Sequence, residues 1–197
     1  MLATHPSLGA KTAPQLIALA KSKPDELFYG SSGVGTAAHL AGELFNVSAG
    51  VKLVHVPYKG VNLAMQDVLA GNIHFVVIGI PAAAPHIKAG KLKALAVLAP
   101  RRSAALPDVP TAAESGMPEF DVTTWYGVLA PAGTPRPIVT RLNQEIARIM
   151  HSEELKVPLA ASGTDPLTDT PEEFAAYIKQ EIAKWGDVVR KANLKAD

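Results

Sequence analysis

The 197-residue chain contains no cysteine, which excludes disulfide bonds, thiolate catalysis and cysteine-ligated metal sites. It has no run of about 18 apolar residues, so no membrane-spanning helix is expected. Lysine and arginine number 19 and aspartate and glutamate 18, for a formal net charge of +1. Because neither sign predominates, the charge does not indicate electrostatic binding to nucleic acid or to an anionic membrane.

Glycine and proline are plentiful, at 15 and 16 residues, and they separate segments with strand-like and helix-like patterns. Continuous apolar runs predict strands at 27–30, 52–56, 73–78 and 92–98. Helical spacing and capping residues predict helices at 12–21, 36–49, 61–70 and 81–89, with a short helix at 111–115 in a proline-rich connection. This alternation of apolar strands and helices is typical of a mostly parallel α/β sheet.

The pattern changes in the last third of the chain. A strand is expected at 122–130, and two long amphipathic helices follow it. The first helix is expected to be capped by Thr134, and the second by a capping box of Thr170 and Glu173. Because this part has too few strands for a sheet of its own, we place a boundary between lobes near residues 125–131. Its helices are expected to pack on a sheet supplied from elsewhere.

A glycine-rich turn, Ser31 to Thr36, joins the first predicted strand to a helix. The first N–H groups of a helix have no partner within it, and the helix dipole places partial positive charge there. Ser31, Ser32 and Thr36 add hydroxyl donors. Gly33 and Gly35 allow a ligand to approach the backbone closely. The turn can therefore stabilise a carboxylate or a phosphate, although the same pattern is equally typical of a well-capped turn with no ligand.

Several other chemistries do not fit the residues. A P-loop is not expected, because no lysine followed by serine or threonine comes after Gly35, and the third position of a dinucleotide-binding pattern holds Ala38. A serine nucleophile would need G-x-S-x-G, whereas Gly30 and Gly33 flank two serines. The six histidines form no closely spaced pair. We therefore expect no metal site and no cofactor.

Five segments in series carry a resemblance to a known family. They are residues 29–45 (YGSSGVGTAAHLAGELF), 54–60 (VHVPYKG), 87–97 (IKAGKLKALAV), 106–111 (LPDVPT) and 129–135 (LAPAGTP). Together they resemble the Bug or TctC family, the extracytoplasmic solute receptors of tripartite tricarboxylate transport systems. The resemblance extends over essentially the whole chain, in order and with family-like spacing.

The resemblance implies an α/β, type II periplasmic-binding-protein fold, in which two lobes close on a ligand in the manner of a Venus flytrap. It implies a periplasmic receptor, not an enzyme, that captures a small carboxylate and presents it to the membrane permease subunits of the transporter. Neither insertion into the membrane nor a nucleic-acid partner is implied. An effector-sensing module of a regulator stays open as the alternative, because regulators use the same fold.

The resemblance also assigns ligand-binding residues. A plain carboxylate is favoured over an amino acid, because Gly79 stands where many family members carry an acidic or polar residue. Lys59 is available for a second acidic group on the ligand. The assigned residues are Ser31, Ser32, Gly33, Gly35, Thr36 and His39 in the first loop and its helix, Tyr58, Lys59 and Gly60 in a second loop, and Gly79 and Ile80 in a third.

The resemblance begins inside the second lobe of the family. Residues 9–124 are expected to form a complete ligand-binding lobe, and residues 125–197 the crossover strand and C-terminal helices of an incomplete other lobe. Residues 1–6 contain neither the basic nor the apolar segment of an export signal. The apolar faces of the helices could also drive self-association.

Four side chains outside these loops invite an interpretation. Trp125 and Tyr126 are expected either to line the cleft near the hinge or to be buried where the chain crosses between lobes. Trp185 is expected to pack in a core, because it lies at helical spacing from other apolar residues. Arg102, in the turn Arg101-Arg102, is expected only to be solvated.

Overall fold

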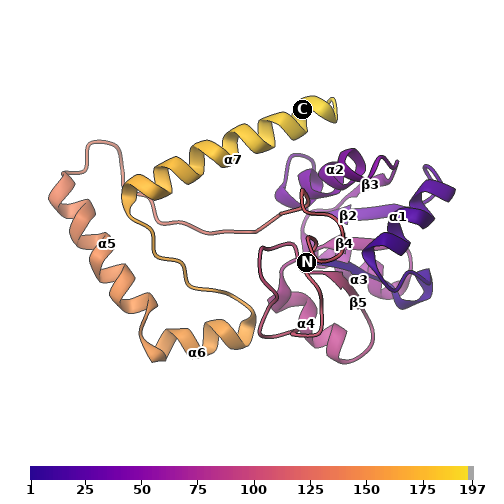
Figure 1. Cartoon of the computed structure of the whole chain (residues 1–197), viewed down its shortest axis with the longest axis horizontal. Helices are drawn as coiled ribbons and strands as arrows, with labels where there is room; N and C mark the ends of the chain where they lie inside the picture. The colour runs from indigo at the N-terminus through magenta and orange to yellow at the C-terminus, as the bar shows by residue number, and fades with distance from the viewer. Residues whose placement is uncertain (195–197) are drawn as a thin grey trace.

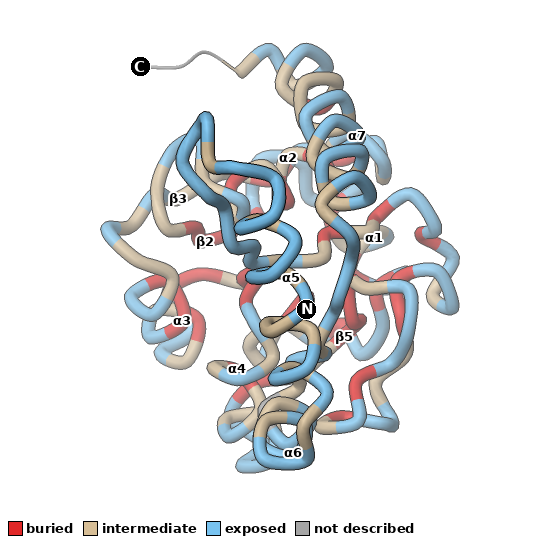
Figure 2. Tube along the Cα trace, turned by 90° about the vertical axis from the view of Figure 1, so that its left-hand side faces the viewer, coloured by how far each residue is buried: buried red, intermediate tan, exposed pale blue. Residues whose placement is uncertain are grey.

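The computed structural model describes residues 1–194 and divides the chain into two regions (Figure 1). The sheet region, residues 1–124, contains the five strands that the structure describes and helices on both of their faces. The helical region, residues 125–194, extends away as two helices and returns as a third. Figure 2 shows that buried segments are concentrated in the sheet region.

The strands follow the order β3-β2-β4-β1-β5 across the sheet. β2 pairs in parallel with β3 and β4, as expected, but β1 runs antiparallel to both β4 and β5. β1 was not predicted from the sequence, yet its three residues are fully buried. The α/β expectation is thus confirmed, and the sheet is mixed. The strands are β1 (Leu2–Thr4), β2 (Phe28–Ser31), β3 (Val54–Pro57), β4 (Phe75–Val77) and β5 (Lys93–Ala96).

Helices cover the two faces of the sheet and form two separate cores. Phe75 and Val77 of β4 point into the core beneath α1 and α2, whereas Val76 points into the core beneath α3 and α4, as the alternation of a strand requires. Gly30 lets α3 approach β2, because a Cβ there would lie 2.6 Å from Ala64 Cβ. These helices, near their predicted bounds, are α1 (Ala13–Ser22), α2 (Ala37–Ala49), α3 (Val61–Ala70) and α4 (Ile80–Lys88), and a 3-10 turn, η1 (Pro6–Leu8), precedes them.

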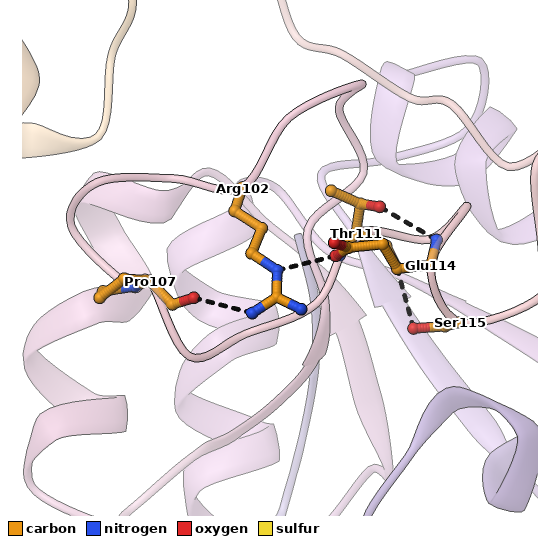
Figure 3. Close-up of polar contacts among 5 residues, drawn as sticks. All are labelled: Arg102, Pro107, Thr111, Glu114 and Ser115. Atoms are coloured by element: carbon orange, nitrogen blue, oxygen red, sulfur yellow. Dashed lines mark hydrogen bonds and ion pairs between the residues drawn. The ribbon is translucent and has the colours of Figure 1, made fainter.

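The connection after β5 contains turns in place of the helix predicted at 111–115. Thr111 forms an isolated bridge with Val97, and the Thr111 N–H donates to Glu114 Oε2 at 2.8 Å. Figure 3 shows Arg102 between Glu114 and Pro107, with 2.8 Å to the carboxylate and 3.1 Å to the carbonyl. The expectation that Arg102 is only solvated is therefore wrong, because its guanidinium ties two ends of this connection together.

The strand predicted at 122–130 is wrong, because these residues have no strand assignment. A strand requires a neighbour for its N–H and C=O groups, and no described strand lies beside this segment. Tyr126 is 93% exposed. Trp125, in contrast, packs edge-on against Phe174 and Tyr177 at ring-centroid distances of 5.5 Å. The segment is therefore held by aromatic contacts instead of a sheet.

The helical region contains one helix more than predicted. The first of its helices begins after Pro135, and Thr134 donates its hydroxyl to Pro131 O at 2.8 Å instead of capping the helix. The capping box of Thr170 and Glu173 is confirmed. The last helix packs its C-terminal half on α2 and buries Val188 in the first core, where Trp185 also packs as predicted. The helices are α5 (Arg136–Met150), the unpredicted α6 (Glu153–Ser162) and α7 (Pro171–Lys191).

Candidate functional site at the carboxyl ends of three parallel strands

The residues assigned to ligand binding lie at or just after the carboxyl ends of β2, β3 and β4 or in the first turn of the helix that comes next. β2 lies between β3 and β4, and all three run in the same direction, so their three loops meet at one edge of the sheet. The chain leaves β2 toward β3, whereas it leaves β4 toward the opposite side of the sheet, where β5 lies. Such a switch point, between β2 and β4 here, is the usual position of a ligand crevice in an open α/β sheet.

The turn Ser31 to Thr36 is closed by hydrogen bonds to one carbonyl. Gly33 O accepts from Thr36 Oγ1 at 2.7 Å and from Ser31 Oγ at 3.1 Å. Gly33 and Gly35 have φ angles of 126° and 75°, a region that side chains disfavour. A side chain at either position would therefore strain the turn. The two glycines are needed for the shape of the loop as well as for access to it.

Three helices begin at this edge without a side-chain cap. Thr36, Gly60 and Gly79 are the N-cap residues of α2, α3 and α4, and none of them donates or accepts a side-chain capping bond. Among the described residues, no protein acceptor is recorded for the N–H groups of Ala37 and Ala38 at the start of α2. Unpaired N–H groups and the helix dipole stabilise an anion at such a position.

Two of the assigned side chains lie inside the protein. Ser31 is fully buried, and its Oγ lies 2.6 Å from His55 Nε2. His39 is buried as well, and its Nδ1 accepts the Gly35 N–H at 3.0 Å. Burial lowers the pKa of His39 below its ordinary value. These two residues therefore hold the loop from beneath.

The Ser31–His55 contact has the geometry of a nucleophile and a base, but Ser31 is 0% exposed and so offers no surface to a substrate. A hydrolase would also need an acid to orient the base, and Asp67, after the second loop, accepts instead from Tyr58 Oη at 2.6 Å. In the part of the chain that the structure describes, no cluster of three potential metal ligands is found. The same described residues include no helix that is both long and apolar enough to cross a membrane.

The second loop is tied to the first. The Tyr58 N–H donates to Ser31 O at 3.1 Å. Burial, together with the hydrogen bond from Tyr58 Oη to Asp67, raises the pKa of Tyr58 to about 12. Lys59, the next residue, is exposed, and no ion pair is recorded for it among the described residues. Lys59 is therefore an exposed cation at this edge of the sheet.

The third loop lies against the helical region. A Cβ on Gly163, the C-cap of α6, would lie 2.6 Å from Ile80 Cγ2. Ile80 is thus packed close to the end of α6, while Gly79 before it is exposed. The third loop offers no acidic side chain, because Gly79 has none and Ile80 is apolar.

Sequence reasoning missed His55 and Glu43 as parts of this edge. His55 pairs with Tyr29 across β2 and β3, and Tyr29 Oη donates to Glu43 Oε1 at 2.7 Å. The strand register that brings His55 under the turn cannot be read from the sequence. The spacing of His39 and Glu43, four residues apart on one helical face, was a signal that could have been used.

The chain matches the family described as "Tripartite tricarboxylate transporter family receptor", TctC, over residues 1–194. Protein BugT of Bordetella pertussis is 37% identical over 195 residues, which cover 99% of this chain and 60% of that protein. The chain thus spans three fifths of the length of this relative. The match confirms the resemblance that the five segments indicated.

Two solved structures that are similar to this chain in sequence have the same fold. "R. palustris Rpa4515 with adipate" is 36% identical, with a TM-score of 0.87 over 98% of this chain and 64% of that chain. "MatC (Rpa3494) from Rhodopseudomonas palustris with bound malate" is 31% identical, with a TM-score of 0.80 over 96% of this chain and 65% of that chain. The expected fold of a periplasmic solute-binding protein is thereby confirmed.

Proposed function

Because the chain belongs to the TctC family of tripartite tricarboxylate transporter receptors, we propose that it captures a small dicarboxylate for such a transporter. The single observation that carries this proposal is the turn Ser31 to Thr36. It leads into α2 at the switch point of the sheet, and no protein acceptor is recorded among the described residues for the first N–H groups of that helix. The adipate and malate of the two structural neighbours are the class of ligand that such a turn favours.

One carboxylate is proposed to bind at the start of α2. It would accept from the N–H groups of Ala37 and Ala38 and from the hydroxyl of Ser32, which is only half-buried. Thr36 and Gly33 shape the turn through their own hydrogen bond. Backbone donors and a helix dipole recognise negative charge without a basic side chain, which suits a loop that has none.

The second acidic group is proposed to meet Lys59. This side chain is exposed and follows β3, the strand beside β2. The third loop contributes Gly79 and Ile80, which offer no partner for an ammonium group. A plain dicarboxylate is therefore favoured over aspartate or glutamate.

Presentation to membrane permease subunits in the periplasm is proposed from the family alone. The family consists of transporter receptors, and a structural neighbour is a periplasmic binding protein. The proposed role is therefore binding and not catalysis. The exposed loops at the edge of the sheet are the part of the chain that a closing partner lobe would cover.

Calorimetric titration with adipate, malate, citrate, aspartate and acetate tests the ligand class. The chain is titrated alone and again after extension by the part of a longer relative that the match does not cover. Binding of adipate or malate, with aspartate and acetate at least about tenfold weaker, would support the proposal. No binding of any dicarboxylate by the extended chain would refute it.

Lys59→Gln separates the two parts of the proposed site. It removes the cation and leaves the turn intact, so adipate should weaken by about tenfold, as for one charge-assisted hydrogen bond, while acetate should be unchanged. Lys52→Gln is the matched control, because Lys52 is also exposed and precedes β3 instead of following it. Equal effects of the two substitutions would contradict the role of Lys59.

A further inference from the structure

A ring stack lies beneath the glycine-rich turn and connects it to three elements. His39 of α2 stacks on His55 of β3, with ring centroids 4.0 Å apart, and His55 stacks on Tyr29 of β2 at 5.0 Å. Tyr29 fits against α2 only because Gly42 has no side chain, since a Cβ there would lie 2.0 Å from the ring. The His39 ring is thus packed against His55, which is itself packed against Tyr29.

Both histidines contact the turn through a named nitrogen. His39 Nδ1 accepts the Gly35 N–H at 3.0 Å, and His55 Nε2 lies 2.6 Å from Ser31 Oγ. An imidazole nitrogen accepts a hydrogen bond only while it carries no proton. The bond to Gly35 therefore requires a neutral His39 ring with its proton on Nε2.

We propose that His39 is a positioning residue, which fixes the carboxylate-binding turn by accepting the Gly35 N–H and releases the turn when its ring becomes doubly protonated. A protonated Nδ1 would present a donor to the N–H donor of Gly35, so the bond would be replaced by repulsion. The proposal rests on the proposed function for the role of the turn, but the bond itself can be measured without any ligand.

The charges around His39 decide when this release occurs. His55 faces it from β3, Tyr29 from β2, and Glu43 from the next turn of α2. Burial lowers the pKa of His39, and the Glu43 carboxylate partly offsets this effect. α7 also brings charged side chains to α2, but they lie beside the C-terminal half of α2, whereas His39 is in its first turn. The groove there is lined by Lys184, Asp187 and Lys191 of α7 and by Leu44, Val47 and Ser48 of α2.

The sign of the pH effect follows from these shifts. A histidine whose pKa is lower in the folded protein binds fewer protons there than in the unfolded chain. Its contribution to stability is complete above the ordinary pKa of about 6.5 and is lost as the pH falls toward the folded pKa. Burial, and then the charge of a protonated His39, lower the pKa of His55 to about 4, so the ring that contacts Ser31 stays neutral down to about that pH.

The test measures the turn in the ligand-free chain. Imidazole ¹⁵N shifts report the tautomer of His39 between pH 8 and pH 4.5, and hydrogen exchange reports the Gly35 amide. We expect His39 to carry its proton on Nε2 at pH 8. Protection of the Gly35 amide, corrected for the intrinsic exchange rate, should fall by roughly fivefold to tenfold as His39 titrates, as for loss of one hydrogen bond.

Substitutions separate positioning from stability. His39→Asn keeps an acceptor near the place of Nδ1, whereas His39→Leu fills the space without one. His74→Leu is the matched control, because His74 Nδ1 likewise accepts a backbone N–H, that of Phe28 at 2.9 Å, at the other end of β2. His39→Leu should weaken adipate binding about tenfold, and His39→Asn and His74→Leu should weaken it by less than about threefold.

Two results would overturn the proposal. One is an equal effect of His39→Leu and His74→Leu on both adipate affinity and Gly35 exchange. The other is undiminished protection of Gly35 in the unsubstituted chain when His39 is doubly protonated, which needs no variant to fold. If neither the unsubstituted chain nor its extended form binds any dicarboxylate at any pH, the proposed function fails, and Gly35 exchange in the ligand-free chain still decides the role of His39.

Discussion

The sheet region and the helical region both contain amphipathic helices, but the apolar faces of these helices are buried to very different extents. Leu16 of α1 is 0% exposed, whereas Leu142 of α5 is 49% exposed and its neighbour on the same stripe, Ile138, is 50% exposed. α5 has no buried residue among those the structure describes. An apolar stripe therefore predicts a helix and the direction of its apolar face, but burial also needs a second surface, which α5 does not find in the described part of this chain.

α7 belongs to both regions. Its C-terminal half packs on α2 and buries Val188, while Phe174 near its start contacts Trp125 in the segment between the regions. Glu181, midway along the helix, accepts the indole N–H groups of Trp125 and Trp185 at 3.3 and 3.0 Å. α7 and the Glu181 carboxylate thus attach the segment at Trp125 to the sheet region, and the end of α6 makes a separate contact with it at Ile80.

Matched leucine substitutions test the difference between the regions most directly. Leu16→Ala should lower the free energy of unfolding by about 2–5 kcal/mol, because it removes a fully buried side chain and leaves a cavity. Leu142→Ala should change it by about 0.5 kcal/mol or less, as for an exposed position. Urea unfolding followed by circular dichroism measures both. A cost at Leu142 comparable to that at Leu16, increasing with protein concentration, would show that the stripe is covered by a second copy.

The attachment through Glu181 should give an intermediate effect. Glu181→Ala leaves two indole N–H groups without an acceptor and should cost about 1–3 kcal/mol, with a shift in tryptophan emission, since the chain has only two tryptophans. Glu181→Gln keeps an acceptor oxygen and should cost less. Glu172→Ala, an exposed carboxylate on the same helix paired with Arg136, is the control and should leave the emission unchanged. Identical emission in all three variants would argue against the attachment.

Most of the sheet region could be predicted from the sequence, because its signals are local. Thr12 caps α1, Gly71 ends α3 in a left-handed conformation, and the helix between residues 61 and 70 has its predicted bounds. β1 could not be predicted, since Leu2–Thr4 is too short to show a period. The strand expected at 122–130 had the right composition but lacks a partner strand. Strand formation depends on such non-local contacts, which a sequence pattern does not contain.

The sequence predicted which loops come together at the candidate site, but only part of what each side chain does there. The loops after β2, β3 and β4 follow apolar runs that the sequence makes plain, so their meeting at one edge follows from a parallel arrangement. The direction in which each side chain points does not follow from the parallel arrangement. Ser31 and His39 were expected to face the ligand, but they are turned beneath the loop because the strand register places His55 there. Their assignment to ligand contact stays a prediction, and the structure favours a supporting role.

The smallest expected effect on stability comes from surface ion pairs, and it also differs between the sheet region and the helical region. Arg102 is partly exposed, yet it bonds both the Glu114 carboxylate and the Pro107 carbonyl. Arg141 of α5 pairs, among the described residues, with Glu145 of the same helix, and such exposed pairs contribute little. Arg102→Ala should therefore lower the urea midpoint slightly, and Arg141→Ala should leave it within error. Glu114→Ala should lower the urea midpoint more than Arg102→Ala does, because it also removes the acceptor for the N–H of the buried Thr111. The reverse order would mean that the guanidinium alone holds this connection.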